Sequence, residues 1–115
     1  MISAALSHIE SIIGGELPAT YRRFLADEVG DNDPCEITTV HGDSVYLYSY
    51  HHIIERNQTY KIQDAEPHVL LIGQDGNIGY FIRLGHNEAI YSVDLGALGC
   101  LEMDEEAKNI YLLRA

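Results

Sequence analysis

Apolar side chains recur at intervals of three and four residues near the start of the chain: Leu6, Ile9, Ile12 and Ile13. This spacing predicts one face of a helix. Ser3 is the predicted N-cap, and Gly14-Gly15 ends the helix because glycine accepts the left-handed conformation of a C-terminal cap. A second set follows Leu17-Pro18 at the same spacing: Tyr21, Phe24, Leu25 and Val29. Proline suits a first helical position, so we expect a second helix that ends at Gly30 and forms a helical hairpin with the first.

The pattern changes to β-branched and aromatic residues beyond Gly30. Five segments have strand character: 36–40, 45–48, 69–72, 78–84 and 91–95. The first two predict a hairpin across 41–44. The continuous apolar run at 69–72 is typical of a strand covered on both faces. Asp75-Gly76 is a strong turn signal, so the last three segments predict an antiparallel meander.

Two further helices are predicted outside these strands. Ser49 would cap a short helix to about Asn57, with three side chains turned inward: Tyr50, Ile53 and Ile54. Residues 58–67 are interpreted as a connection. Asp104 would cap the last helix, whose apolar positions are Ala107, Ile110 and Leu113 or Leu112. The element order predicts a single α+β domain over 1–115, an antiparallel sheet flanked by an N-terminal helical hairpin and short additional helices.

Composition adds a strong charge to this picture. The 115 residues include 18 Asp+Glu against 7 Lys+Arg, which gives a formal net charge of −11. The apolar fraction of 46% is enough for a folded core, so the charge does not indicate disorder. A protein with an isoelectric point near 4.7 repels phosphate-rich surfaces. Nucleic acid and anionic membranes are therefore excluded as expected ligands, and a basic protein is the expected partner.

The ends of the chain and its cysteines predict a compartment. The first residues lack the basic start and apolar run of a signal peptide. No stretch approaches the length of about 20 apolar residues that spans a bilayer. Cys35 and Cys100 lie far apart, which is typical of ordinary thiols in a reduced cytoplasmic protein. A Cys35–Cys100 disulfide is the alternative.

Familiar ligand motifs fail on inspection of their spacing. The segment 73–79 is rich in glycine but has no lysine and leads into a strand, so it predicts a hairpin turn and not a phosphate loop. Asp31 and Asp33 resemble the start of a calcium loop. Glu36 and Gly42, however, occupy positions where that loop needs glycine and glutamate. No calcium or phosphate site is predicted.

The sequence also contains no recognisable metal-binding or catalytic motif. The chain has six histidines: His8, His41, His51, His52, His68 and His86. None forms a zinc-binding motif with another histidine or with either cysteine. No serine lies in a nucleophile elbow, and no carboxylate pair is identifiable from spacing. We therefore expect no cofactor, no metal and no enzymatic activity, with unrecognised carboxylates or histidines left open as a catalytic alternative.

The acidic residues fall in two clusters. The first contains no base and holds the candidate partner-binding residues: Asp27, Glu28, Asp31, Asp33 and Glu36. Asp27 and Glu28 lie near the predicted C-terminal end of a helix, where the dipole disfavours anions, so Arg22 and Arg23 would offset part of this cost. The second cluster has a structural explanation as the first turn of the last helix. It contains Glu102, Asp104, Glu105 and Glu106.

Tyrosines supply eight of the aromatic side chains, and several lie in the middle of the chain: Tyr46, Tyr48, Tyr50 and Tyr60. Tyrosine is common at interfaces because it joins a large apolar ring to a polar tip. The same properties suit a half-buried sheet. Packing is the favoured interpretation of this group, and interface contact is the alternative.

Short motifs resemble those of the SUKH superfamily in their order along residues 5–95. They are Ile9-Glu10, Gly15, Leu17-Pro18, Tyr21-Arg22, Phe24-Leu25, Gly30, then 54–57 (Ile-Glu-Arg-Asn), 71–76 (Leu-Ile-Gly-Gln-Asp-Gly) and 90–94 (Ile-Tyr-Ser-Val-Asp). The superfamily includes a fungal cell-wall-synthesis regulator and many bacterial immunity proteins. The resemblance implies an α+β fold and a binding function.

That binding function, if the resemblance holds, is the neutralisation of a cognate toxin domain, frequently a nuclease. A nuclease is basic where it holds phosphate, and an acidic protein can occupy that surface. The expected function is thus a cytoplasmic immunity protein that binds a basic toxin domain. The alternative is a regulatory scaffold of the same fold that binds a cellular protein.

Overall fold

The computed structural model describes residues 2–29, 35–84, 88–99 and 102–114. Its helices are α1 (Ile2–Ile13), α2 (Ala19–Phe24), α3 (Tyr50–Thr59), α4 (Ile62–Ala65) and α5 (Ile110–Leu113), with a π-helical turn η1 (Leu25–Val29) and a 3₁₀ turn η2 (Leu95–Ala97). Its strands are β1 (Cys35–Thr38), β2 (Ser44–Leu47), β3 (Val69–Asp75), β4 (Ile78–Arg83), β5 (Ile90–Asp94) and β6 (Asp104–Ala107). They form one antiparallel sheet in chain order, β1-β2-β3-β4-β5-β6, so the predicted α+β class is confirmed.

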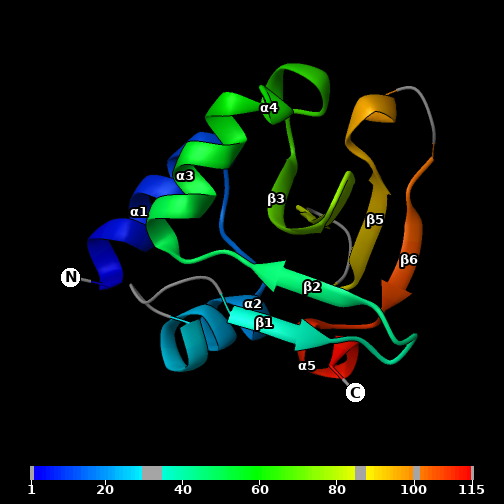
Figure 1. Ribbon diagram of the computed structural model, residues 1–115. Helices are drawn as coiled ribbons and strands as arrows, with labels where there is room; N and C mark the ends of the chain where they lie inside the picture. Colours follow the sequence, from blue (N-terminus) through cyan, green and yellow to red (C-terminus); the bar gives the residue numbers. More distant parts are fainter. Residues whose placement is uncertain (1, 30–34, 85–87, 100–101, 115) are drawn as a thin grey trace.

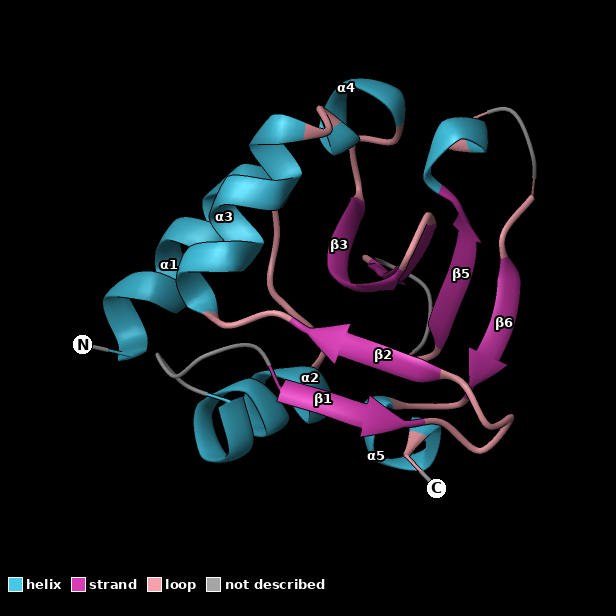
Figure 2. Ribbon diagram, viewed as in Figure 1, coloured by secondary structure: helices cyan, strands magenta, loops and turns pink. Residues whose placement is uncertain are grey.

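The sheet is strongly curled, and helices cover it in two groups (Figures 1 and 2). α1 packs on α3, which contacts β3, whereas α2 packs on α5, which contacts β6. The rings of Phe24 and Tyr111 meet edge to face at 5.7 Å between their centroids, which joins α2 to α5. The strands β3 and β4 lie in the middle of the sheet, and their apolar side chains are buried except for Ile78, the exposed first residue of β4.

The apolar faces of the N-terminal helices are buried as predicted, although α1 packs with α3 and α2 with α5 and the two helices are not packed together as the predicted hairpin. Leu6, Ile9 and Ile13 are buried, and Gly14 ends α1 in the left-handed region with φ of +75°. The second apolar face is also buried: Tyr21, Phe24, Leu25 and Val29. The predicted N-cap is wrong, because α1 begins at Ile2 and already includes Ser3. The predicted helix end at Gly30 lies outside the described residues.

Asn57 connects α3 to the central strand. Its side chain is 1% exposed and accepts a hydrogen bond from the backbone N–H of Leu71 at 3.0 Å. Its Nδ2 donates to the carbonyls of Leu71 at 2.9 Å and Ile53 at 2.7 Å. Gln63, on α4, donates to Asn57 Oδ1 at 3.0 Å and to the Val69 carbonyl at 2.8 Å. These bonds hold α3 and α4 against the beginning of β3.

The last predicted helix is wrong in its first half. Residues 104–107 form the edge strand β6, which pairs with β5: Asp104 lies opposite Ser92, and Glu105 lies opposite Tyr91. Pairing with a preformed strand supplies these backbone groups with partners, and charged residues are characteristic of sheet edges. The helix is only Ile110–Leu113, and its N-cap is Asn109, whose Oδ1 accepts the Leu112 N–H at 3.0 Å.

The connection 58–67 also contains more structure than predicted. α3 extends to Thr59, and α4 follows after Lys61, which has a positive φ of 52°. Ile62 is the buried anchor of α4 and accounts for its position against β3. Ser49 does occupy the N-cap position of α3, but its hydroxyl makes no capping hydrogen bond. None of the described helices is long and apolar enough to cross a membrane.

Candidate functional site

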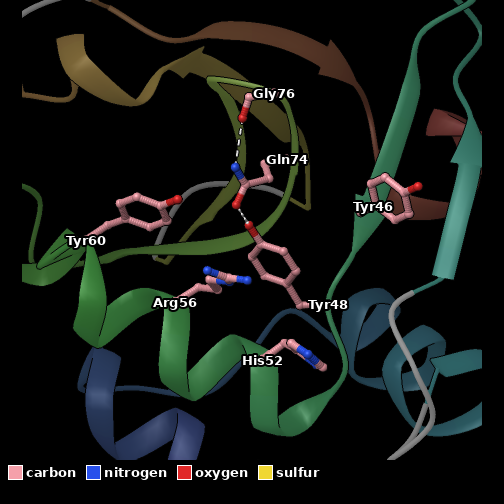
Figure 3. Close-up of a pocket in the computed structure, with 7 residues that line it drawn as sticks. All are labelled: Tyr46, Tyr48, His52, Arg56, Tyr60, Gln74 and Gly76. Atoms are coloured by element: carbon pink, nitrogen blue, oxygen red, sulfur yellow. Dashed lines mark hydrogen bonds between the residues drawn. The ribbon is translucent and has the colours of Figure 1, made fainter.

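A pocket of about 350 Å³ lies between α3 and the strands β2 and β3 (Figure 3). From α3 and the turn that follows it come His52, Arg56 and Tyr60. From β2, β3 and their ends come Tyr46, Tyr48, Gln74 and Gly76. A volume of this size is in the range of small-molecule sites, which begins at roughly 300 Å³.

Local structure explains why these side chains meet. His52 and Arg56 are four residues apart on α3, so they lie on one face of the helix. Tyr46 and Gln74 are register partners across β2 and β3. Gly76, with φ of +60°, makes the tight turn into β4.

Hydrogen bonds fix the wall of the pocket on the strand side. The Tyr48 hydroxyl donates to Gln74 Oε1, and Gln74 Nε2 donates to the Gly76 carbonyl at 2.7 Å (Figure 3). Burial raises the pKa of the Tyr48 hydroxyl well above its usual value, with Arg56 opposing and Tyr60 adding to the increase. The Tyr48 phenol is therefore a neutral donor throughout the physiological pH range.

The helix side of the pocket carries His52 and the cationic Arg56. His52 Nδ1 lies 2.8 Å from the Ser49 hydroxyl, which holds the imidazole ring in place. Arg56 extends from α3 into the space between Tyr60 and Tyr48 (Figure 3). Its Nε is buried and has no hydrogen-bond partner. The nearest described carboxylate oxygen, on Glu55, is 3.9 Å from that nitrogen, beyond hydrogen-bond distance.

The four tyrosines of the central cluster divide between packing and exposure. Tyr48 and Tyr50 are buried, as packing requires. Tyr46 and Tyr60, both at the pocket, are 52% and 40% exposed. Packing is thus confirmed for two members, while the other two present aromatic surface to solvent.

A group of carboxylates surrounds the hydroxyl of Tyr80 on another part of the sheet. Burial raises the pKa of Tyr80 to about 12, and Glu106, Asp43 and Asp75 each add to the increase. These three acids come from β6, from the β1–β2 turn and from the end of β3. Segments far apart in the sequence therefore meet here. We call Asp43, Asp75, Asp104, Glu105 and Glu106 the acidic edge.

Few cations neutralise the acidic edge. Lys108 Nζ pairs with Glu105 at 3.1 Å, and His41 Nε2 lies 3.7 Å from Glu106 Oε1. Glu106 also accepts a hydrogen bond from the Ser92 hydroxyl at 2.6 Å. Asp43, Asp104 and Glu105 are exposed. On the edge strand β6, Glu105 and Glu106 thus have partners, whereas Asp104 is exposed and makes no described ion pair.

The predicted partner-binding cluster is only partly within the described residues. Asp27 and Glu28 are exposed on η1, and Glu36 is exposed on β1 opposite Tyr46. Asp31 and Asp33 lie outside the described residues. The arginine that pairs with Glu28 is Arg114, whose Nη2 donates to Glu28 Oε2 at 3.3 Å, and not Arg22 or Arg23 as expected. Arg22 lies instead near Glu10, with 3.8 Å between Nε and Oε2. Partner binding by this cluster stays a prediction.

No protein-family model matches the chain, and no curated protein matches its sequence. The resemblance to the SUKH superfamily therefore rests on the quoted residues alone. Within the described part of the chain, no group of three or more His, Cys, Asp or Glu side chains is placed to hold a metal ion. Cys35 is a free, half-buried thiol, and Cys100 lies outside the described residues.

Sequence reasoning missed the pocket and the acidic edge for different reasons. The spacing of His52 and Arg56 on one helix face was a usable signal for the pocket. Gln74, by contrast, joins them only because β2 and β3 are paired. The convergence of Asp43 and Asp75 with Glu106 depends on the curl of the whole sheet, which no local pattern contains.

We expect alkaline pH to unfold the protein through its buried phenols. Burial raises the pKa of Tyr21, Tyr48 and Tyr80 in the folded state. Above the ordinary tyrosine pKa of about 10, the unfolded chain loses these protons first, so the free energy of unfolding falls as pH rises. Urea titrations between pH 8 and 12 test this, and Tyr80→Phe should flatten the slope. A slope unchanged by Tyr80→Phe would contradict the role of its phenol.

Proposed function

We propose that this protein is a non-enzymatic immunity protein that neutralises a basic bacterial toxin domain by direct contact. The observation that carries the proposal is the acidic edge, in which carboxylates from three separate segments act on the Tyr80 hydroxyl, one of them from the edge strand β6. The net charge of −11 and the motif resemblance support it. Complementary charge also accelerates capture, with steered association reaching roughly 10⁸–10⁹ M⁻¹s⁻¹ at low salt.

Two acidic surfaces are candidates for the contact. One is the cluster predicted from the sequence, of which Asp27, Glu28 and Glu36 are described. The other is the acidic edge. Glu28 is already paired with Arg114, whereas Asp43 and Asp104 make no described ion pair and are exposed. We therefore favour the acidic edge as the main contact and the cluster as its electrostatic support.

Co-expression with the basic toxin domain encoded at the same locus tests the function itself. We expect the protein to restore growth and to form a complex with that domain in pull-down and calorimetry. Neutralisation of no toxin domain from the locus would overturn the immunity assignment. Binding to a non-toxic cellular protein would instead favour the regulatory scaffold.

Charge reversal then locates the contact. The double variant Asp43→Lys, Asp104→Lys should weaken toxin binding at least about tenfold at low salt and flatten its salt dependence, because screening acts on these exposed charges. The matched control Asp27→Lys, Glu36→Lys makes the same change of net charge on the other surface. A larger loss in the control would move the contact to the predicted cluster, and unchanged affinity in both would refute a charge-based interface. Exposed substitutions cost less than about 0.5 kcal/mol each, so folding should persist in both.

A further inference from the structure

The pocket between α3 and the strands differs in charge from the surface around it. Its lining contains two residues that can carry positive charge, Arg56 and His52, and no Asp or Glu. We propose that this pocket binds a single carboxylate carried on a small flat organic group. The proposal goes beyond the toxin contact, since the pocket uses none of the residues of the acidic edge.

Arg56 supplies the reason for an anion. Its Nε is buried without a hydrogen-bond partner, and a buried donor left in this state is costly. Two other arginines have close partners: Arg114 pairs with Glu28, and the Arg83 guanidinium lies over the Tyr91 ring at 5.4 Å, whereas the acid beside Arg56 Nε is Glu55 at 3.9 Å. Guanidinium groups bind carboxylates through paired N–H donors. The rest of this guanidinium is accessible, because the Arg56 side chain is 40% exposed, and a carboxylate in the pocket can pair with it.

The remaining polar groups are already oriented. Tyr48, Gln74 and Gly76 form a hydrogen-bonded chain along one wall, and Ser49 holds His52 at Nδ1. When Nδ1 of His52 accepts the proton of the Ser49 hydroxyl, Nε2 carries the ring N–H and can donate it to a ligand. Tyr48 uses its only O–H on Gln74, so the donor that this wall leaves for a ligand is the second N–H of Gln74 Nε2, which its bond to Gly76 already orients.

Two tyrosines at the pocket favour a particular kind of organic group on the carboxylate. Tyr46 and Tyr60 are about half exposed at the pocket and offer ring faces and edges to a guest. Aromatic pairs prefer offset or edge-to-face contact, so a flat ring gains more here than a short alkyl group. The pocket therefore favours an aryl carboxylate over acetate.

The charge of the surroundings limits the guest to one negative charge. Asp75 lies in the chain between the lining residues Gln74 and Gly76, and Glu55 is adjacent to Arg56. With a net charge of −11 over the chain, a phosphate dianion meets more repulsion than a carboxylate does. Two sources can supply this chemistry, a free carboxylic acid or an acidic side chain of the protein partner.

Titration of the isolated protein tests the site without any partner. Benzoate, acetate and inorganic phosphate are added separately while NMR follows the Gln74 side-chain amide and the Gly76 backbone amide. We expect saturable shifts with benzoate and binding about three- to tenfold weaker with acetate, as aromatic contact predicts. Phosphate should bind more weakly than benzoate. No saturable shift, or phosphate binding at least as tight, would overturn the proposal.

Substitutions connect the shifts to Arg56. Arg56→Gln should weaken benzoate binding at least about tenfold because it removes the charged donor. Arg23→Gln removes the same charge from an exposed position on α2 and should leave binding unchanged. Equal loss in both would show that net charge, and not the pocket, governs binding. Thermal unfolding, together with the NMR signals of the Phe24 ring and the Ile53 methyl groups, confirms that each variant is folded.

Competition identifies the source. If benzoate displaces the toxin domain, the natural guest is an acidic side chain of that partner. If the toxin domain and benzoate bind together, the guest is a free carboxylic acid. Both results retain the carboxylate site, and failure of the toxin experiment leaves the titration unaffected.

Discussion

Replacing Asn57 with aspartate should lower the free energy of unfolding by about 3–5 kcal/mol, the largest effect expected of one polar substitution in this protein. The side chain is 1% exposed, and its Nδ2 donates to the carbonyls of Ile53 and Leu71. A carboxylate has no donor for either carbonyl at neutral pH. It also places a buried charge against two oxygen atoms.

Urea denaturation followed by circular dichroism measures this loss. The matched control is Gln58→Glu, which makes the same amide-to-acid change at the next, exposed position of α3. Its effect should remain within about 0.5 kcal/mol. Lowering the pH to 4 should restore part of the stability of Asn57→Asp, because a protonated carboxyl regains a donor. Equal midpoints for the two variants at neutral pH would contradict the bridging role of Asn57.

Gly73→Ala should cost about 2–3 kcal/mol and disturb the pocket at the same time. A Cβ at position 73 would lie 2.5 Å from the Tyr46 carbonyl oxygen and 3.2 Å from the Leu47 Cα. Backbone atoms cannot rotate away as a side-chain tip can, so β2 must shift from β3. The shift moves Tyr46 and Tyr48, and benzoate binding should weaken in parallel with stability.

Gly96→Ala is the control for this effect. Its Cβ would meet only the Asp94 carboxylate, at 3.2 Å. We expect a loss below about 1 kcal/mol and unchanged benzoate binding. If Gly73→Ala proves as mild as the control, the close approach of β2 and β3 does not limit the choice of residue there.

Local periodicity predicted the elements whose partners lie close in the chain. The faces of α1 and α2, the β1–β2 hairpin and the β3–β4 turn at Gly76 all follow from spacing of a few residues. β6 could not be found in this way. Asp104, Glu105 and Glu106 carry no strand signal of their own, and their conformation is decided by pairing with β5.

The same distinction applies to the candidate sites. Exposure of Asp27, Glu28 and Glu36 follows from their charge, but their partners do not, since Glu28 pairs with Arg114 from the far end of the chain. The tyrosine cluster was visible in the sequence. Which rings face the core could not be predicted. Tyr46 precedes Leu47, the last residue of β2, and Tyr48 follows it, so Tyr48 lies just beyond the strand, where its hydroxyl bonds to Gln74.

The pairing order of the sheet also has a kinetic consequence. Because every strand pairs with its neighbour in the chain, the strand pairs other than β2–β3 close short loops and lose little chain entropy before their bonds form, while β2–β3 closes the segment 48–68 that contains α3 and α4. Among the described residues, one backbone pairing outside the strands joins segments far apart in the chain: Thr39 bridges to Arg114, and the Val40 N–H donates to the Leu113 carbonyl. Folding can therefore proceed hairpin by hairpin, and the long-range contact of Thr39 and Val40 with Leu113 and Arg114 forms last. We expect the same contact to be the first to open in the native protein.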